Sequence, residues 1–210
     1  PQDFDDKLLN IMAKYDNICD YVHLPLQSGS DNVLKRMNRT YTKKEFINLV
    51  NKIRSILPNC SITTDIIVGF PGEADSDFSE TLEMMKINKF NFAYMFKYSS
   101  RPGTKAAEYG NQIDENVKQK RLEQLIKTQS EITLLQNKKK IGSIENVLIE
   151  KESKKSSDFW SGRTEGNTWT IVKKNNEKIK DVIPVVIDDA QGVTLFGKNI
   201  TKEEAIYEIN

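Results

Sequence analysis

Three polar loops carry the residue types with which this sequence could bind a ligand. They are QSGS (27–30), GFPGE (69–73) and SSRPGT (99–104), and each directly follows a short apolar stretch. Glycine lets backbone N–H and C=O groups approach a ligand closely. Parallel strands would present all three loops at one edge of a sheet, where βα proteins bind ligands. Together the loops predict a ligand site, although turns of βα proteins need Gly and Pro in any case.

Few other residues stand out as catalytic candidates. The only histidine, His23, lies beside apolar residues, which is more typical of a hydrogen-bonded structural histidine than of a catalyst. Asp65 lies inside the apolar run TTDIIVGF, where an ionised carboxylate is costly unless it is paired. It either faces a ligand or has a buried Lys or Arg partner, and the sequence leaves both readings open. No catalytic residue is assigned.

Composition limits the possible classes of protein. The chain has 210 residues, 38% hydrophobic and 29% charged, with a net charge of +1, so it can form one large domain or a large and a small one. Cys19 and Cys60 make neither a disulfide framework nor a CxxC metal site. We therefore expect reduced, buried cysteines in a cytoplasmic protein. The start PQDFDDKLLNIM lacks an initiator Met, which suggests a fragment of a longer polypeptide.

The elements that must position these loops alternate between strand and helix. Ser30 is placed to cap a short helix, and Thr42 and Glu45 have capping-box spacing at the start of a longer one. Strands alternating with helices predict parallel βαβ units. The expected strands are 21–26, 61–68 and 90–99, and the expected helices are 30–37, 42–57, 75–90 and 114–140.

The last third of the chain has a different residue pattern. Five short β-type segments, VLIEK, DFWSGRT, TWTIVKK, DVIPVVI and VTLFGKNI, are separated by Gly, Asn and Asp. This pattern predicts a small all-β barrel. We place the boundary near residue 137, which gives domains of residues 1–137 and 138–202.

The start of this β-rich region is locally basic. Between Asn137 and Ser157 there are six lysines and three glutamates, in a chain that is otherwise almost neutral. A solvated basic face is a common explanation of such an excess. The alternative is contact with RNA phosphates, with Phe159, Trp160, Arg163 and Trp169 available for stacking and backbone contacts.

Three stretches resemble the radical S-adenosylmethionine (SAM) methylthiotransferases: HLPLQSGSDNVLKRMNRTYT, TTDIIVGFPGE and YSSRPGTKAAE. The segment SKKSSDFWSGRTEGN and the β-rich tail resemble their TRAM domain. The resemblance implies an α/β fold: the second half of a radical-SAM (β/α) TIM-like barrel followed by a small, OB-like TRAM barrel. It also implies that Gln27, Ser28, Ser30, Asp65, Gly69, Gly72 and Glu73 contact SAM. The residues expected to contact RNA are Arg101, Lys138, Lys139, Lys140, Lys154, Lys155, Trp160 and Arg163.

Within this family, MFKYSSRPGT and GRTEGN are most similar to the tRNA-modifying MiaB type. The resemblance then implies addition of a methylthio group to carbon 2 of an isopentenylated adenosine, with the tRNA anticodon stem-loop as partner. The branch that acts on threonylcarbamoyl-adenosine shares HLPLQSGS and TTDIIVGFPGE, so it stays an alternative. A stand-alone RNA-binding module on a βα scaffold and a βα-barrel enzyme without iron are further alternatives.

The sequence departs from the family in one respect. The family holds a 4Fe-4S cluster through a CxxxCxxC motif, and this chain has no such motif, since its two cysteines are Cys19 and Cys60. The resemblance therefore implies cluster ligands outside this chain. We expect that the chain does not catalyse the reaction alone.

Overall fold

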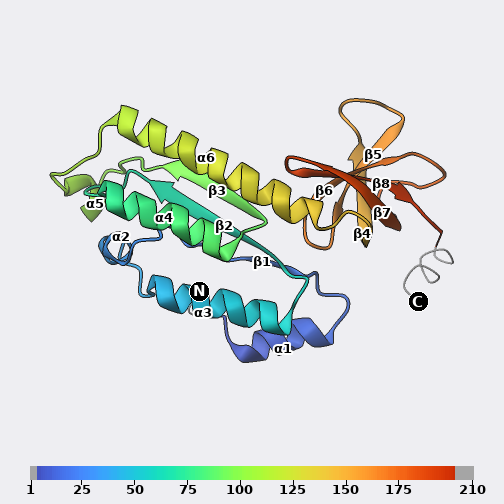
Figure 1. Cartoon of the computed structure of the whole chain (residues 1–210), viewed down its shortest axis with the longest axis horizontal. Coiled ribbons are helices and arrows are strands. Elements are labelled where there is room, and N and C mark those ends of the chain that lie inside the picture. The colour runs from blue at the N-terminus through green and yellow to red at the C-terminus, as the bar shows by residue number, and fades with distance from the viewer. Residues whose placement is uncertain (1–3, 202–210) are drawn as a thin grey trace. The chain divides into compact units, whose positions relative to one another are not determined.

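The computed structural model describes residues 4–201 of the chain. It has two compact units (Figure 1). The βα unit extends to Ile18 and resumes at Val22–Ile132, and the barrel unit contains Cys19–Tyr21 and the chain from Thr133 on. Helix α6 (Glu115–Lys138) passes from the first unit into the second. Among the described residues no helix is long and apolar enough to cross a membrane.

A three-stranded sheet organises the βα unit. Its order is β1-β2-β3, with β1 (Tyr21–His23), β2 (Ser61–Val68) and β3 (Phe92–Lys97). Strands β2 and β3 are parallel, as the alternating pattern predicted. The first strand is shorter than the expected 21–26, because Pro25 has no N–H to donate to the sheet. The chain pairs with β2 again at Gln27, which forms an isolated parallel bridge with Ile66.

Helices with recognisable caps connect the strands. The Ser30 side chain accepts from the Val33 N–H, and Thr42 and Glu45 form the capping box, so both predicted caps are confirmed. At the start of α4 the Asp77 carboxylate accepts from the Ala74 N–H and caps the helix. Glu80, further along α4, forms an ion pair with Lys43 at 2.5 Å and takes no part in the cap. The helices are α1 (Asp6–Lys14), α2 (Asp31–Arg36), α3 (Lys43–Ile56), α4 (Asp75–Asn88), α5 (Lys105–Glu108) and α6.

Two hydrophobic clusters fix the sheet against its helices. One joins β1 and β2 to α1 and α3 and includes Phe46, Val50 and Ile53; the other joins β2 and β3 to α4 and α6. Figure 1 shows α4 and α6 running alongside β2 and β3. Leu125 is buried there, whereas its neighbour Ile126 is 43% exposed. One residue turns a helix by about 100°, so Ile126 faces away when Leu125 faces the sheet.

The two cysteines have different environments. Cys60 is buried in the first cluster, as expected. Cys19 is exposed, so the expectation that it is a buried core residue is wrong. It precedes β1, in a short connection with no apolar cluster to cover it. Cys19 therefore contributes nothing to the described hydrophobic cores.

The barrel unit is a closed five-stranded barrel, as the five β-type segments predicted. Its order is β4-β5-β6-β8-β7, so the parallel pair β6–β8 completes an otherwise antiparallel barrel. Closure leaves no free strand edge. The interior is apolar and includes Val147, Ile149 and Val185. The strands are β4 (Ile144–Glu152), β5 (Phe159–Thr164), β6 (Trp169–Lys173), β7 (Val182–Gln191) and β8 (Thr194–Asn199).

Candidate functional site

A cavity of about 840 Å³ lies where the strands of the βα unit end. Gln27, Asp65 and Arg101 all line it, so the structure brings together one predicted residue from each of three neighbouring segments. Ile67 and Phe96 add apolar surface from β2 and β3. The position agrees with the rule that open α/β sheets bind ligands outside the carboxyl ends of their strands.

Gln27 enters this cavity from an unusual backbone conformation. Its φ is 67°, in the left-handed region that residues other than glycine seldom occupy. Such backbone strain is often found at functional sites. The residue is 8% exposed, and its side-chain Oε1 accepts from Arg39 Nη2 at 3.4 Å. The bridge to β2 and this side-chain contact therefore hold Gln27 at the cavity wall.

Asp65 has a histidine partner. Its Oδ2 lies 3.3 Å from His23 Nε2, and the other ring nitrogen of His23 lies 2.9 Å from Thr63 Oγ1. The His23 ring also packs edge-to-face against Tyr94, which stands opposite Asp65 in the β2–β3 register. The buried Lys or Arg partner considered for Asp65 is therefore wrong. His23 is hydrogen-bonded, and Asp65 still has about 29% of its side chain exposed.

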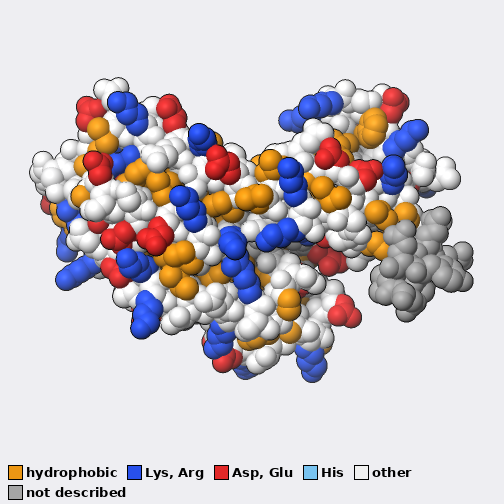
Figure 2. Space-filling model, viewed as in Figure 1, with side chains coloured by type: hydrophobic (Ala, Val, Ile, Leu, Met, Phe, Trp, Pro, Cys, Tyr) orange, Lys and Arg blue, Asp and Glu red, His pale blue; other side chains and the backbone are white. Residues whose placement is uncertain are grey.

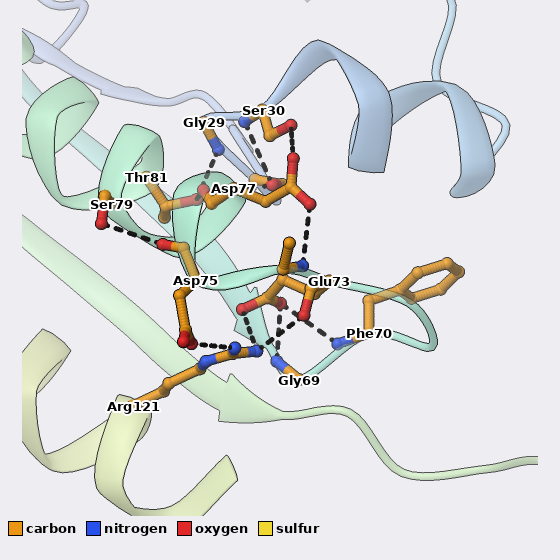
Figure 3. Close-up of polar contacts among 12 residues, drawn as sticks. Gly29, Ser30, Gly69, Phe70, Glu73, Asp75, Asp77, Ser79, Thr81 and Arg121 are labelled. Carbon is orange, nitrogen blue, oxygen red and sulfur yellow. Dashed lines mark hydrogen bonds and ion pairs between the residues drawn. The ribbon is translucent and has the colours of Figure 1, made fainter. Parts of the chain in front are cut away.

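The rest of the QSGS loop faces helix α4. The Gly29 N–H donates to Thr81 Oγ1 at 2.9 Å, and Ser30 Oγ donates to Asp77 Oδ1 at 2.6 Å (Figure 3). Ser28 is buried and its hydroxyl lies 3.5 Å from that of Thr81. Ser28 and Ser30 do not line the cavity. They attach the loop to α4, and Gln27 alone of this patch reaches the cavity.

The GFPGE loop is organised by a buried ion pair. Glu73 Oε2 accepts from the N–H groups of Gly69 and Phe70 at 2.7 and 3.2 Å. Its Oε1 lies 3.0 Å from Arg121 Nη1, and Arg121 Nη2 donates to Asp75 at 2.6 Å (Figure 3). Burial raises the pKa of Glu73, while Arg121 and the two N–H groups oppose this increase. The pair fixes the turn after β2.

Gly69, Gly72 and Glu73 form this turn, and none of them lines the cavity. Gly69 and Gly72 have φ of 72° and 76°, which explains the choice of glycine. The Gly72 N–H donates to the Asn111 carbonyl at 2.8 Å, and a side chain at Gly72 would collide with the Arg36 guanidinium. Phe70, between the two glycines, is the residue of this loop that reaches the cavity.

Sequence reasoning missed Arg121 and most cations of the cavity. Arg121 lies four residues before the buried Leu125, so it shares the apolar side of α6. A cation on the apolar side of a helix indicates a buried acidic partner. The missed cavity cations are Lys35, Arg36, Arg39, Lys97 and Lys105. They lie within stretches that resemble the family, but only the fold reveals that they surround one cavity.

A second hollow, of about 530 Å³, lies on the barrel unit. Lys151, Lys154 and Lys155 line it together with the rings of Phe159 and Trp169, and we call it the barrel groove. Trp169 stands between two cations, since Lys151 Nζ and Arg163 Cζ lie 4.4 and 4.3 Å from its ring centroid. Figure 2 shows Lys and Arg side chains around the loops of this unit. The remaining lining residues are Ser153, Ser156, Ser161, Ile171, Thr194 and Phe196.

The other residues expected to contact RNA lie outside the barrel groove. Trp160 alternates with Phe159 along β5 and packs against the barrel core. Arg163 Nε lies 3.4 Å from Glu150, and Lys140 forms an ion pair with Glu145 at 2.9 Å. Lys138 ends helix α6, and Lys139 follows it. Of the predicted lysines, only Lys154 and Lys155 lie in the groove.

The residues present do not fit an iron–sulfur cluster. In the described part of the chain no three His, Cys, Asp or Glu side chains are grouped in a way that could hold a metal ion. Cys19 is exposed and Cys60 is buried in an apolar cluster. The SAM cofactor is a different case, because Gln27 and Asp65 offer it an amide and a carboxylate in one cavity.

Comparison with known proteins gives consistent results for the two units. Residues 1–85 match the radical SAM superfamily, and residues 138–200 match the TRAM domain. Coproporphyrinogen III oxidase from Escherichia coli, a radical SAM enzyme, aligns with a TM-score of 0.54 at 13% identity. The alignment covers 79% of this chain and 45% of the oxidase. This likeness concerns the fold.

Sequence relatives cover nearly the whole chain. The tRNA-2-methylthio-N(6)-dimethylallyladenosine synthase of Christiangramia forsetii is 45% identical over 95% of this chain and 42% of the synthase. The synthase of Karelsulcia muelleri is 46% identical over 94% of this chain and 44% of its own length. The chain thus spans less than half the length of these relatives. We conclude that residues 1–85 are similar to the radical SAM superfamily and that residues 138–200 are similar to the TRAM domain.

Proposed function

We propose that this chain provides cofactor-pocket walls and an RNA-binding surface to a tRNA methylthiotransferase. The reaction is the addition of a methylthio group to carbon 2 of an isopentenylated adenosine next to the anticodon. The observation that carries this proposal is the barrel groove, where three lysines and three aromatic rings meet in a region similar to the TRAM domain. The names of the similar synthases favour this base over threonylcarbamoyl-adenosine. Because the substrate is tRNA, we place the activity in the cytoplasm.

In this proposal Gln27 and Asp65 hold SAM in the cavity of the βα unit. SAM carries a sulfonium and an ammonium group, and within the described part of the chain Asp65 is the one carboxylate that lines the cavity. His23 orients that carboxylate from β1. Ser28, Ser30, Gly69, Gly72 and Glu73 act indirectly by fixing the loops that carry Gln27 and Phe70. In this family SAM supplies the methyl group and the radical that removes hydrogen from the base.

The barrel groove is tested with the variant Lys151→Gln/Lys154→Gln/Lys155→Gln. Binding of a labelled tRNA anticodon stem-loop should weaken, and the slope of log K against log salt should fall by about 2, at roughly 0.7 per phosphate contact. The variant Trp169→Leu should weaken binding about tenfold with the slope unchanged, because stacking is not ionic. Fluorescence anisotropy across a salt series measures both.

The matched control removes three exposed lysines elsewhere, Lys86→Gln/Lys120→Gln/Lys127→Gln. None of them lines the barrel groove or the βα cavity. If the control variant lowers the slope as much as the groove variant does, binding is a diffuse charge effect and the groove has no special role. A Lys138→Gln/Lys139→Gln variant tests the expected contribution of the end of α6.

Reconstitution tests the expected absence of cluster ligands. After anaerobic incubation with iron and sulfide, the 210-residue chain should remain without a stoichiometric cluster and form no 5′-deoxyadenosine. The reason is that the chain has two cysteines, Cys19 and Cys60, whereas the family holds its cluster with the three thiolates of a CxxxCxxC motif. Iron content per chain and visible absorbance provide the measurement. A stable four-iron stoichiometry would show that the ligands were misassigned.

A further inference from the structure

The cavity of the βα unit is far more cationic than SAM binding requires. Among the described residues, six cationic side chains line it against the single carboxylate of Asp65. Within residues 4–201 only one of the six, Lys97, has a carboxylate partner, Glu115 at 2.5 Å. The other five, which we call the cationic rim, are Lys35, Arg36, Arg39, Arg101 and Lys105. Their charges are therefore available to an anionic ligand.

Neutral groups hold two guanidinium groups of the rim in place. Arg36 Nη2 donates to Asn111 Oδ1 at 3.0 Å, and its Cζ lies 5.2 Å from the Tyr109 ring centroid. Arg39 donates to Gln27, as described above. These contacts restrict the side chains without neutralising them. A preorganised guanidinium of this kind suits the oxygen atoms of a phosphate.

SAM does not match this charge. Its sulfonium and ammonium groups outweigh its single carboxylate, so it is itself a cation. Like charges repel strongly in a partly enclosed cavity, where the effective dielectric constant is below that of water. The rim therefore needs a second ligand that is anionic. An exposed aromatic ring, Phe96, with 51% of its surface accessible, lines the same cavity and could stack on a base.

We propose that the cationic rim is a phosphate-binding site for the RNA strand, separate from the barrel groove. It takes consecutive phosphates on either side of one nucleotide, and Phe96 stacks on the base between them. This inference rests on the proposed function, since it assumes an RNA substrate. It assigns RNA contacts to Lys35, Arg36, Arg39, Lys105 and Phe96. For Arg101, which was already expected to contact RNA, it specifies a contact with phosphate.

The test uses the 210-residue chain and the same labelled stem-loop. The variant Arg39→Gln/Arg101→Gln/Lys105→Gln replaces three exposed side chains, so the fold should persist. Its affinity should fall at least tenfold at low salt, and the salt slope should fall by about 2. The charge-preserving variant Arg39→Lys/Arg101→Lys should keep the slope. The variant Phe96→Leu should weaken binding without changing the slope.

The outcomes separate this proposal from the proposed function. If the barrel-groove variant loses RNA affinity and the rim variant matches the Lys86, Lys120 and Lys127 control, the rim proposal fails and the proposed function stands. If neither variant differs from that control, the rim proposal and the proposed function both fail. Calorimetry measures whether inorganic pyrophosphate binds to the chain and to the rim variant. If the rim variant loses pyrophosphate binding but keeps its affinity for the stem-loop, the rim binds a different anion and the assignment to RNA is overturned.

Discussion

Replacing Arg121 by methionine should lower the free energy of unfolding of the βα unit by about 3–5 kcal/mol. Glu73 is 5% exposed and would lose the one ion-pair partner that it has within residues 4–201, while its carboxylate stays buried. The variant Arg121→Met/Glu73→Gln should recover most of this loss, because a buried pair costs little when both charges are removed. Urea unfolding followed by circular dichroism measures the effect.

The loss should also depend on pH. Burial raises the pKa of Glu73 above its usual 4.5, so protonation of this group stabilises the folded state. That stabilisation is complete below the unfolded pKa and disappears as the pH rises through the folded pKa. Without Arg121 the folded pKa rises further. Arg121→Met should therefore lower the free energy of unfolding more at neutral pH than below pH 4.5. An equal decrease at both pH values would contradict the ion-pair argument.

The chain provides an internal control for these measurements. Its two tryptophans, Trp160 and Trp169, both belong to the barrel unit. Their fluorescence should report an unchanged barrel transition when Arg121 is replaced. A shift of the tryptophan signal that equals the change in circular dichroism would mean that the substitution acts on the whole chain rather than on the βα unit.

Gly29→Ala should destabilise the βα unit by about 3 kcal/mol, at the upper end of the cost of overpacking. A Cβ at Gly29 would lie 2.5 Å from Thr81 Cα, 2.7 Å from the Glu80 carbonyl oxygen and 2.8 Å from the Thr81 nitrogen. All three are backbone atoms, so relief requires α4 to move away from the loop. The new methyl group would also disturb the Gly29 N–H bond to Thr81.

Gly110→Ala is the matched control, because a Cβ there meets nothing within 4 Å. It should change the free energy of unfolding by less than about 0.5 kcal/mol, as is usual for surface substitutions. Thermal or urea unfolding of the two variants provides the comparison. Equal stability of Gly29→Ala and Gly110→Ala would show that the loop moves away from α4 at little cost.

Sequence patterns predicted those parts of the fold that local chemistry determines. Ser30 and Thr42 cap helices because the acceptor and the N–H lie within one turn, and that relation is visible in the sequence. The five barrel strands were also predictable from their β-branched runs and intervening turns. The parallel pairing of β6 with β8, by contrast, depends on contacts that no local pattern reveals.

The candidate site was less predictable, because it depends on distant contacts. Gln27 and Ser28 are neighbours, yet one lines the cavity and the other faces Thr81, more than fifty residues along the chain. Phe159 and Trp160 must point to opposite sides of β5, but the sequence did not show which of them faces out. The pairing of Glu73 with Arg121 likewise requires the docked α6.

The strand order of the barrel has a consequence for synthesis of the protein. Strand β8 is the last in the chain but lies between β6 and β7. While a ribosome makes this region, β6 and β7 each have an open edge until residues 194–199 emerge, and open edges invite wrong pairing. Thr194 and Phe196 of β8 also line the barrel groove. A nascent chain therefore acquires the complete groove only when this last strand closes the barrel.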